Sequence, residues 1–383
     1  MIDQTLVACQ RQTGSVHELL MRNEKEGAMP DLPESMMAVR LFEYGDPSVL
    51  QYVEVPLPEI EPDEVLMQVR ATSVNNWDLN YRKGLLTAPP GRPPLPLPFQ
   101  LGREAAGEVA AVGQEVKGFR PGDKIVAMTC PACGHCEYCM RGLDNLCVNT
   151  VLPGHQRFGG YAEYVAVKEV NLLHGPESLS FEKQSCCLWS YGTVWHMAVA
   201  RGGLQSGQDV LITGASSGMG TAAIQIARLG GARRIFGTTG SQEKIHRLEE
   251  IGVDYALNYH EENVPERVKE ITNGAGVDLA LDNIGGEMFT MAIECLRMDG
   301  TLVSVAKHGG RYVKLDLLLL YRNHLNVLGS RAATRKEQAL VLDIAGRGLI
   351  DPVIDRVLPL SEAAEAHRIM ESQEHFGKIV LVP

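Results

Sequence analysis

The second half of the chain alternates between short apolar runs and longer amphipathic segments. From about residue 205 onward, each apolar run is followed by a segment whose hydrophobic positions recur with a helical period. Strands that alternate with helices in this way are typical of a parallel, doubly wound α/β sheet. The pattern predicts strands at 209–213, 234–238, 255–258, 277–282 and 301–305, and helices at 220–229, 242–251, 264–272 and 288–295.

The first half has a different rhythm, in which short apolar strands are separated by turns and by a proline-rich stretch at 89–98. This pattern predicts an antiparallel, β-rich domain with strands at 37–42, 64–73, 107–112, 124–127 and 161–167. We expect the final apolar strand, 377–382, to rejoin that domain. The resulting organisation is an extension at 1–35 with a short helix at 17–23, a β-rich domain formed by 36–175 and 331–383, and an α/β domain at 176–330.

A glycine-rich turn, 214–220, follows the first strand of the α/β half and leads into a helix; it reads GASSGMG. Dinucleotides bind in this strand–turn–helix context. The glycines let the backbone approach a pyrophosphate, and the helix N-terminus offers free N–H groups and the positive end of its dipole. A tight turn without a ligand is the alternative. We assign to the cofactor site Gly214, Ser216, Ser217, Gly218, Met219 and Gly220.

The end of the second strand favours NADP(H) over NAD(H). An NAD site usually carries an acidic residue there, which binds the ribose 2′-hydroxyl. Here the strand is followed by Thr239 without an acid, and the cation Lys244 comes shortly after it. We expect Lys244 to lie near a 2′-phosphate; the alternative is a solvated helix lysine. Further residues assigned to the cofactor site are Thr193, Tyr259, Asn283, Val305 and Lys378.

Composition narrows the class of protein. The chain has 383 residues, of which 45% are hydrophobic and 22% charged, and its net charge is −11. These values are ordinary for a globular protein of two domains, and the acidic balance argues against nucleic acid as the main partner. No apolar run reaches the roughly 18 residues that a membrane span needs. The N-terminus lacks the pattern of a secretion signal, so we expect a cytoplasmic protein that binds a small-molecule substrate and no membrane.

Five of the nine cysteines fall within residues 130–147. Without a secretion signal, such clustering suggests metal binding before disulfides. Cys133, Cys136, Cys139 and Cys147 are separated by two, two and seven residues, and four thiolates close a tetrahedral zinc site that has no open position. We therefore predict one structural Zn²⁺ per chain. Cys130 adds another two-residue spacing, which leaves an iron–sulfur cluster as one alternative and free thiols as another.

These segments together have a recognisable order. From about residue 37 to the C-terminus, the chain resembles a zinc-containing alcohol dehydrogenase of the medium-chain dehydrogenase/reductase superfamily. The resemblance implies a GroES-like catalytic domain interrupted by a Rossmann domain, a cleft for hydride transfer between the two, and a homodimer or homotetramer. It rests on 101–107 (LGREAAG), 118–123 (GFRPGD), the cysteine lobe at 133–147, 159–164 (GGYAEY) and the turn at 214–220.

The chain departs from that family at the catalytic zinc. The three positions where the resemblance implies zinc ligands hold Asn75, Arg103 and, by approximate alignment, a residue near Trp189. Asparagine is a poor zinc ligand, and arginine is a fixed cation that cannot ligate. We therefore expect no catalytic zinc; a displaced site with Cys186 or Cys187 is the alternative. The stretch from Asn75 to Asp78 resembles the Asn-Pro-Val-Asp stretch of zinc-free quinone oxidoreductases and enoyl reductases in the same superfamily.

Without zinc, hydrogen-bond donors must stabilise the charge that hydride transfer creates. This favours an acceptor that spreads the charge, such as a conjugated C=C bond or a quinone. We expect Asn75 to donate to the carbonyl oxygen, Arg103 to neutralise the enolate or bind an acidic group, and Tyr81 to donate a proton. The alternatives are an ion pair of Arg103 with Glu104 or Asp78, and a packing role for Tyr81.

Two other functions remain open at this stage. One is a zinc-independent carbonyl reductase or alcohol dehydrogenase that acts on a ketone, an aldehyde or an alcohol. The other is a non-catalytic relative that binds NADPH.

Overall fold

The computed structural model describes residues 32–86 and 96–383. The predicted helix at 17–23 and most of the proline-rich stretch lie outside these residues. Contacts divide the chain into two units, residues 1–33 and residues 34–383, and the fold described below belongs to the second unit.

A parallel sheet occupies the second half of the chain, as the alternating pattern predicts. It contains the five predicted strands and a sixth, at 326–329, that the pattern does not predict. Its strand order is β10-β9-β8-β11-β12-β13, which is the doubly wound order of a Rossmann fold. The strands are β8 (Asp209–Ile212), β9 (Arg234–Thr239), β10 (Tyr255–Asn258), β11 (Val277–Asp282), β12 (Leu296–Ser304) and β13 (Asn326–Gly329), and the helices between them are α6 (Gly218–Leu229), α7 (Ile245–Glu250), α8 (Val264–Ile271), α9 (Glu287–Glu294) and α10 (Leu317–Arg322).

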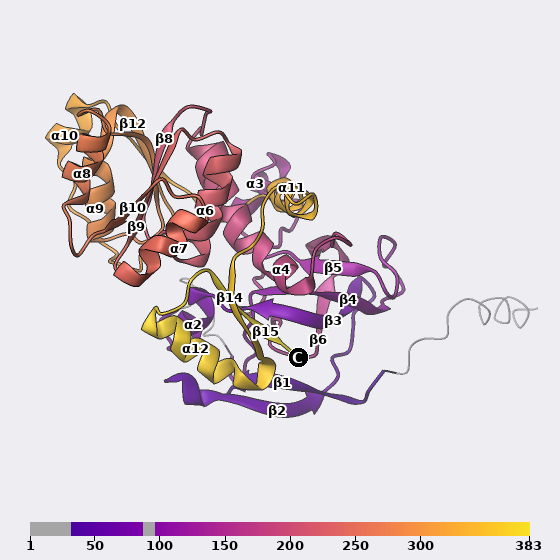
Figure 1. The fold of residues 1–383 in the computed structure, drawn as a ribbon. Coiled ribbons are helices and arrows are strands. Elements are labelled where there is room, and N and C mark those ends of the chain that lie inside the picture. The colour runs from indigo at the N-terminus through magenta and orange to yellow at the C-terminus, as the bar shows by residue number, and fades with distance from the viewer. Residues whose placement is uncertain (1–31, 87–95) are drawn as a thin grey trace, which may run out of the picture. The chain divides into compact units, whose positions relative to one another are not determined.

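Helices cover both faces of this sheet, with α6 on one side and α8 and α9 on the other (Figure 1). Successive side chains of the buried strand β8 pack alternately against the helices on the two faces of the sheet. Val210 and Ile212 pack with the cluster that contains α6, whereas Leu211 packs with the cluster that contains α8 and α9. A strand buried on both faces therefore reads as a continuous apolar run.

Two predicted elements of this half differ most from the structure. The strand β12 begins at Leu296, five residues before the predicted start, because its first part already pairs with β11 at Val277. The predicted helix at 242–251 opens with a separate 3₁₀ turn, η7 (Gln242–Lys244), before α7.

The first half of the chain and two C-terminal strands together form a seven-stranded, mostly antiparallel sheet. Its order is β14-β15-β3-β4-β5-β7, and β6 pairs with β3 beside this path. The strands are β3 (Glu64–Ser73), β4 (Glu104–Val112), β5 (Lys124–Ala127), β6 (Tyr164–Lys168), β7 (Leu172–His174), β14 (Ile354–Pro359) and β15 (Lys378–Val382); β1 (Ser35–Leu41) and β2 (Leu50–Pro56) pair separately as a hairpin.

The last strand joins the sheet of the first half. Val380 and Leu381 of β15 pair antiparallel with Ser73 and Thr72 of β3. This pairing brings the C-terminal segment beside strands that lie 300 residues earlier in the sequence, and it places Lys378 next to the start of β4. The strand predicted at 161–167 begins only at Tyr164, because Ala162 forms an isolated bridge with Ala38 of β1.

A continuous helical segment connects the two sheets and contains two π-helical turns. Wide π turns shift the register of a helix and frequently occur at functional sites. The segment consists of α4 (Phe181–Cys186), η5 (Cys187–Tyr191), α5 (Gly192–Trp195) and η6 (His196–Arg201). The remaining helices are α2 (Asn76–Arg82), α3 (Glu137–Met140), α11 (Arg335–Gly346) and α12 (Ala363–Ser372), with short 3₁₀ turns η2 (Pro47–Val49), η3 (Asp144–Leu146), η4 (Glu169–Asn171) and η8 (Leu360–Glu362).

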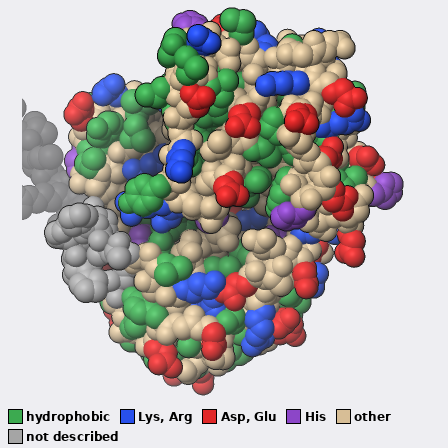
Figure 2. Space-filling view, turned by 90° about the vertical axis from the view of Figure 1, so that its left-hand side faces the viewer, with side chains coloured by type: hydrophobic (Ala, Val, Ile, Leu, Met, Phe, Trp, Pro, Cys, Tyr) green, Lys and Arg blue, Asp and Glu red, His purple; other side chains and the backbone are tan. Residues whose placement is uncertain are grey.

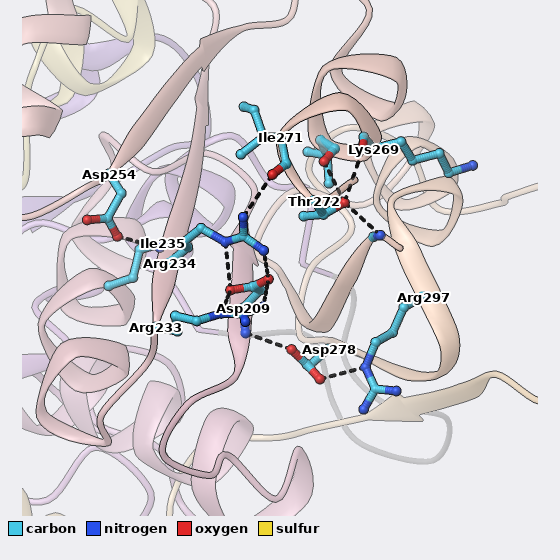
Figure 3. A network of polar contacts seen from close by, with 12 residues as sticks. Asp209, Arg233, Arg234, Ile235, Asp254, Lys269, Ile271, Thr272, Asp278 and Arg297 are labelled. Carbon is cyan, nitrogen blue, oxygen red and sulfur yellow. Dashed lines mark hydrogen bonds and ion pairs between the residues drawn. The ribbon is translucent and has the colours of Figure 1, made fainter. Parts of the chain in front are cut away.

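A network of ion pairs closes the amino-terminal edge of the parallel sheet (Figure 3). The buried Asp209 carboxylate, at the start of β8, accepts hydrogen bonds from the guanidinium groups of Arg233 and Arg234 at the start of β9. Its backbone N–H donates to Asp278, which pairs with Arg297 at 2.5 Å. Burial alone opposes ionisation of Asp209, but the two guanidinium groups outweigh it and lower the pKa of this carboxyl.

The sheet edge at β13 and the neighbouring helix α10 carry exposed apolar side chains, among them Val327, Leu317 and Tyr321. On the face in Figure 2, acidic and basic side chains are interspersed with hydrophobic ones. Within the described residues, no helix has the length and apolar character that crossing a membrane requires.

Candidate functional site

The turn between β8 and α6 is shaped for close approach of a ligand to the backbone. Gly214 adopts a left-handed conformation with φ of +61°, and a Cβ on Gly220 would lie 2.3 Å from the Gly214 carbonyl oxygen. The Ser217 hydroxyl caps α6 by accepting from the N–H of Gly220 at 3.0 Å. A side chain at Gly218 would collide with the aliphatic stem of Lys378, at 2.5 Å from its Cδ. The positive φ at Gly214 and the backbone contact at Gly220 therefore require glycine, whereas a side chain at Gly218 would have to displace the Lys378 stem.

Two buried side-chain oxygens in the α/β half of the chain have no hydrogen-bond partner. Asn283, which follows β11, donates its backbone N–H to the Thr213 hydroxyl at 2.9 Å, so the carboxyl ends of β8 and β11 meet. The side-chain oxygens of Asn283 and Thr193 are buried without a hydrogen-bond partner. Buried polar atoms are seldom left unpaired, so these two fit a ligand that carries hydrogen-bonding groups. Val305 follows the adjacent strand β12, and its N–H donates to Asp282 at 3.2 Å. These residues suit a dinucleotide at the switch point of the sheet.

The residues that the sequence assigns to the adenosine end lie beyond β9. A Cβ on Gly240, just after Thr239, would lie 2.4 Å from the Tyr259 hydroxyl, which brings Tyr259 close to the end of the strand. Lys244 donates to the backbone carbonyls of Gln373 at 2.5 Å and His375 at 2.9 Å. Burial lowers the pKa of Lys244. Two of its three N–H bonds are thus engaged within the chain, and one remains for a ligand.

Glu104 is the hub of a buried polar cluster at the start of β4. One carboxylate oxygen accepts from the Trp189 N–H at 2.8 Å, and the other accepts from Ser73, Asn75 and Lys378. The Lys378 ammonium lies 2.8 Å from this oxygen and 2.7 Å from the Asn75 side-chain oxygen. Because Lys378 also lies against Gly218, one side chain touches both the dinucleotide turn and the polar cluster.

Asn75 holds this cluster to helix α2. Its side-chain N–H groups donate to the Ser73 carbonyl at 3.1 Å and to Glu104 at 3.2 Å, which leaves neither for a substrate. Its backbone N–H donates to Asp78, whose other oxygen accepts from the N–H of Gly102 at 3.0 Å. Burial raises the pKa of Asp78 to about 6, against the effect of these hydrogen bonds. This arrangement favours a positioning role for Asn75 over the direct donation to the carbonyl that the sequence suggests.

Arg103 is buried next to this cluster but forms none of the ion pairs that the sequence allowed. Its guanidinium carbon lies 4.4 Å from the ring centre of Trp189 and 5.1 Å from that of Trp77. One terminal nitrogen lies 3.8 Å from the Cys130 sulfur, while Nε and the other terminal nitrogen have no partner. Burial lowers the pKa of Arg103, and Cys130 opposes this effect. A guanidinium that is held between two indole rings and has free N–H donors is suited to bind an anion.

Tyr81 lies in an aromatic wall. Its ring stacks on Phe99 at 4.9 Å, and its edge faces His155, whose ring also lies 5.7 Å from Trp77. The Tyr81 hydroxyl is buried without a partner, and burial raises its pKa. These surroundings favour the packing role over proton donation.

The four cysteines predicted to bind zinc converge, with all their sulfur atoms within 4.8 Å of one another. Cys136 lies 3.4 Å from Cys139 and 4.0 Å from Cys147, and Cys133 lies 3.9 Å from Cys139. A tetrahedral zinc with bonds of about 2.3 Å places its sulfur ligands about 3.8 Å apart, so the cluster fits this ion. The backbone N–H of His135 lowers the pKa of Cys133 to about 6, which favours the thiolate that zinc needs.

The comparisons with known proteins agree with this geometry. Residues 61–177 match the family model of the alcohol dehydrogenase GroES-like domain, and residues 218–346 match that of the zinc-binding dehydrogenase. The chain is 32% identical to an NAD-dependent alcohol dehydrogenase of Sulfolobus acidocaldarius over 90% of its own length and 99% of that relative. It is a medium-chain dehydrogenase/reductase. The match covers 90% of the dehydrogenase/reductase, in line with the resemblance that runs from about residue 37 to the C-terminus.

Other relatives carry different activities in their names. A quinone oxidoreductase of Pseudomonas aeruginosa is 31% identical over 90% of this chain and 99% of the relative. An acryloyl-coenzyme A reductase of Sulfurisphaera tokodaii is 28% identical over 86% of this chain and 95% of the relative. A crystal structure of an NAD-dependent alcohol dehydrogenase is 38% identical, covers 91% of this chain and 100% of its own, and superposes with a TM-score of 0.85. The dehydrogenase/reductase is thus an oxidoreductase that uses a nicotinamide dinucleotide.

The dehydrogenase/reductase brings together the residues at the expected positions of the catalytic zinc. Asn75 and Trp189 both bind Glu104, and Arg103 lies against Trp189. Among the residues that the structure describes, the cysteine cluster is the one group of three or more side chains suited to a metal ion. Burial raises the pKa of Cys186 to about 12, which disfavours the thiolate of the alternative, displaced site. The absence of a catalytic zinc stays a prediction.

Sequence reasoning missed three members of this centre. The sequence gives Cys130 no clear role, although it contacts Arg103, and it does not indicate His155. It suggests Glu104 only as an ion-pair partner of Arg103, yet Glu104 pairs with Lys378. The family triplet that contains Arg103 and Glu104 was the signal for Glu104; nothing in the sequence marked His155.

Proposed function

We propose that this dehydrogenase/reductase uses NADPH to reduce a conjugated C=C bond or a quinone-like acceptor without a catalytic zinc. The observation that carries the proposal is Arg103, a buried guanidinium with two free nitrogen donors at a position where zinc-containing relatives are expected to hold a zinc ligand. The reduced nicotinamide, when bound, supplies a hydride.

Arg103 provides the charge that the reaction requires. Addition of a hydride to the β-carbon of an enone places a negative charge on the carbonyl oxygen. A fixed cation aimed at that oxygen stabilises the charge as it develops, and burial strengthens the effect. Because Trp77 and Trp189 hold the guanidinium, little reorganisation is needed when the charge appears.

The polar cluster keeps this cation in place. Glu104 fixes the backbone of Trp189, and the same carboxylate is neutralised by Lys378. Glu104 therefore pairs with Lys378 and not with Arg103, whose two unpartnered nitrogens remain for the substrate. Lys378 also supports the turn that would hold the pyrophosphate, through its contact with Gly218.

The relatives support the class of acceptor without deciding it. A quinone oxidoreductase and an acryloyl-coenzyme A reductase are among them, and both names describe conjugated acceptors. The names of an alcohol dehydrogenase relative and of the similar crystal structure support the second candidate, a carbonyl reductase or alcohol dehydrogenase that works without catalytic zinc.

The preference for NADPH rests on the end of β9. Thr239 stands where an NAD enzyme usually carries an acid, and Lys244 and Tyr259 lie close by. The remaining N–H of Lys244 is available for a 2′-phosphate. The alcohol dehydrogenase relative and the similar crystal structure are both named NAD-dependent, so their names do not support this preference for NADPH.

We also propose a homodimer or homotetramer in the cytoplasm. The support for an oligomer is the edge strand β13, where an apolar side chain such as Val327 is exposed beside unpaired backbone groups.

A panel of acceptors tests the reaction. The full-length protein is incubated with NADPH or NADH and with 2-cyclohexen-1-one, 1,4-benzoquinone, benzaldehyde or cyclohexanone, and loss of the reduced nicotinamide is followed. We expect consumption with the enone or the quinone, faster with NADPH. Consumption with the aldehyde or ketone alone would favour the second candidate. Binding of NADPH without consumption by any acceptor would favour a non-catalytic relative.

A further inference from the structure

Reduction of a conjugated C=C bond needs a proton as well as a hydride, and the centre described above lacks an evident donor. After hydride has reached the β-carbon, the enolate becomes a ketone only when its α-carbon takes up a proton. Tyr81 is poorly suited to this step, because burial raises the pKa of its hydroxyl and its ring is packed against Phe99. Arg103 remains protonated throughout.

Cys130 lies beside the cation that faces the enolate. Its sulfur is 3.8 Å from a terminal nitrogen of Arg103, and the residue is buried, with 6% of its surface exposed. It packs with Leu152, Ala332 and the side chain of Trp189, which also contacts Arg103. Cys130 precedes the zinc lobe by three residues, so the lobe holds it without using it as a ligand of the four-cysteine cluster.

We propose that Cys130 is the proton donor to the α-carbon. The inference rests on the proposed reduction of a conjugated C=C bond. In this step the electron pair of the enolate forms the new C–H bond, the S–H bond of Cys130 breaks, and its electron pair stays on sulfur. The thiolate faces the Arg103 guanidinium and regains a proton from water before the next turnover. Hydride and proton together account for the two hydrogens that the substrate gains.

The chemistry of the two groups supports this assignment. Thiols are stronger acids than phenols as a class, and transfer from a thiol to an enolate carbon is favourable. As the substrate loses its negative charge, the charge appears on a sulfur atom next to the same guanidinium. Arg103 therefore stabilises the anion before and after the transfer, with no movement of the cation.

Within the described part of the dehydrogenase/reductase, no other cysteine offers such an arrangement. Burial raises the pKa of Cys187 and of Cys295, and Cys295 lies in the apolar core between α9 and β12. Cys295→Ala is therefore a matched control, since it removes a buried thiol far from Arg103.

The test compares two acceptors that differ in the need for a proton on carbon. Full-length wild type, Cys130→Ala, Cys130→Ser and Cys295→Ala are assayed with NADPH and either 2-methyl-2-cyclohexen-1-one or 1,4-benzoquinone, whose reduced form takes protons on oxygen. We expect Cys130→Ala to lower the ratio of the enone rate to the quinone rate by about 100-fold, the size of a general-acid contribution. Cys130→Ser should fall between this variant and wild type, and Cys295→Ala should keep the wild-type ratio.

A second readout follows the proton directly. In D₂O, a fixed donor delivers deuterium to one face of the α-carbon of 2-methyl-2-cyclohexen-1-one, so the wild type should form a single α-deuterated enantiomer, whereas Cys130→Ala should form a mixture of both enantiomers. A Cys130→Ala variant that keeps both the rate ratio and the single enantiomer would overturn the inference while the proposed function stands. If the folded wild type reduces no conjugated C=C bond, the proposed function fails, and the donor role fails with it.

Discussion

The Lys378 ammonium lies 2.8 Å from the Glu104 carboxylate, and both side chains are almost fully buried. This ion pair joins the last strand of the chain, β15, to the strand β4 that begins beside Arg103. The stem of the same lysine lies against Gly218 in the dinucleotide turn. Sites for the two partners of a hydride transfer are thus connected through one side chain.

Removal of this lysine charge should weaken both stability and cofactor binding. In Lys378→Met, Glu104 stays buried without its cation, and breaking a buried ion pair from one side typically costs about 3 kcal/mol or more. We expect a loss of this size in the free energy of unfolding, measured by urea denaturation at pH 7, together with a higher KM for the dinucleotide.

Arg368→Met is the control for this change, because Arg368 and its partner Glu365 are both about half exposed. Its cost should stay within about 1 kcal/mol. Equal losses in the two variants would contradict the structural role assigned to Lys378.

Metal analysis of the purified protein should find about one zinc per chain, because one cluster of four thiols matches tetrahedral coordination. Cys139→Ser should lose the metal and destabilise the lobe, whereas Cys130→Ser should retain it. Two zinc ions per chain would show that a catalytic metal site exists after all, and loss of zinc in Cys130→Ser would place that residue among the ligands.

Replacement of Lys244 should change the KM for NADPH but not the KM for NADH. In Lys244→Gln, the cation expected near the 2′-phosphate is gone, and a charge-assisted hydrogen bond is worth about 1.5 kcal/mol or more. The KM for NADPH should rise about tenfold, while that for NADH changes little. Steady-state kinetics with both cofactors measures this. A parallel rise for both would mean that Lys244 acts through its contacts with Gln373 and His375 alone.

The Asp209 network should make stability depend on acid pH. Because Arg233 and Arg234 lower the pKa of Asp209 in the folded state, its ion pairs stabilise the fold above the ordinary pKa of an aspartate. This contribution is lost as the pH falls through the lowered value. Asp209→Asn should therefore cost about 3 kcal/mol at pH 7 and progressively less toward pH 3, as urea unfolding at each pH would show.

Asp343→Asn, which alters an exposed pair with Arg347, is the matched control and should show little change at any pH. If the difference in the free energy of unfolding between Asp209→Asn and wild type stayed constant from pH 7 to pH 3, the lowered pKa of Asp209 would not contribute to stability as expected.

Much of the fold was predictable because local pattern determines it. The strands at 64–73, 124–127, 255–258 and 277–282 occur at the predicted residues, since each is a short apolar run bounded by turn residues. The cysteine cluster was predictable for a similar reason, because its ligands are close in sequence and their spacing alone limits the geometry.

The catalytic centre was less predictable, because its contacts join distant parts of the chain. Lys378 meets Glu104 across 274 residues, and Trp189 meets Glu104 across 85. Pattern analysis identifies such residue types but not which of them pair. Asn75 is an example. Its amide is a suitable donor by type, but both of its side-chain N–H groups already donate to neighbours that the tertiary fold brings close.

The proposed reaction depends on the charge of Arg103, a dependence that kinetics of Arg103 variants can measure. The value of kcat/KM for the best conjugated acceptor is measured for wild type, Arg103→Met, Arg103→Lys and, as a surface control, Arg120→Met. If Arg103 stabilises the developing enolate, Arg103→Met should lose about 100-fold or more, Arg103→Lys should recover part of the loss, and Arg120→Met should match wild type. A folded Arg103→Met that retains the wild-type kcat/KM would contradict the account.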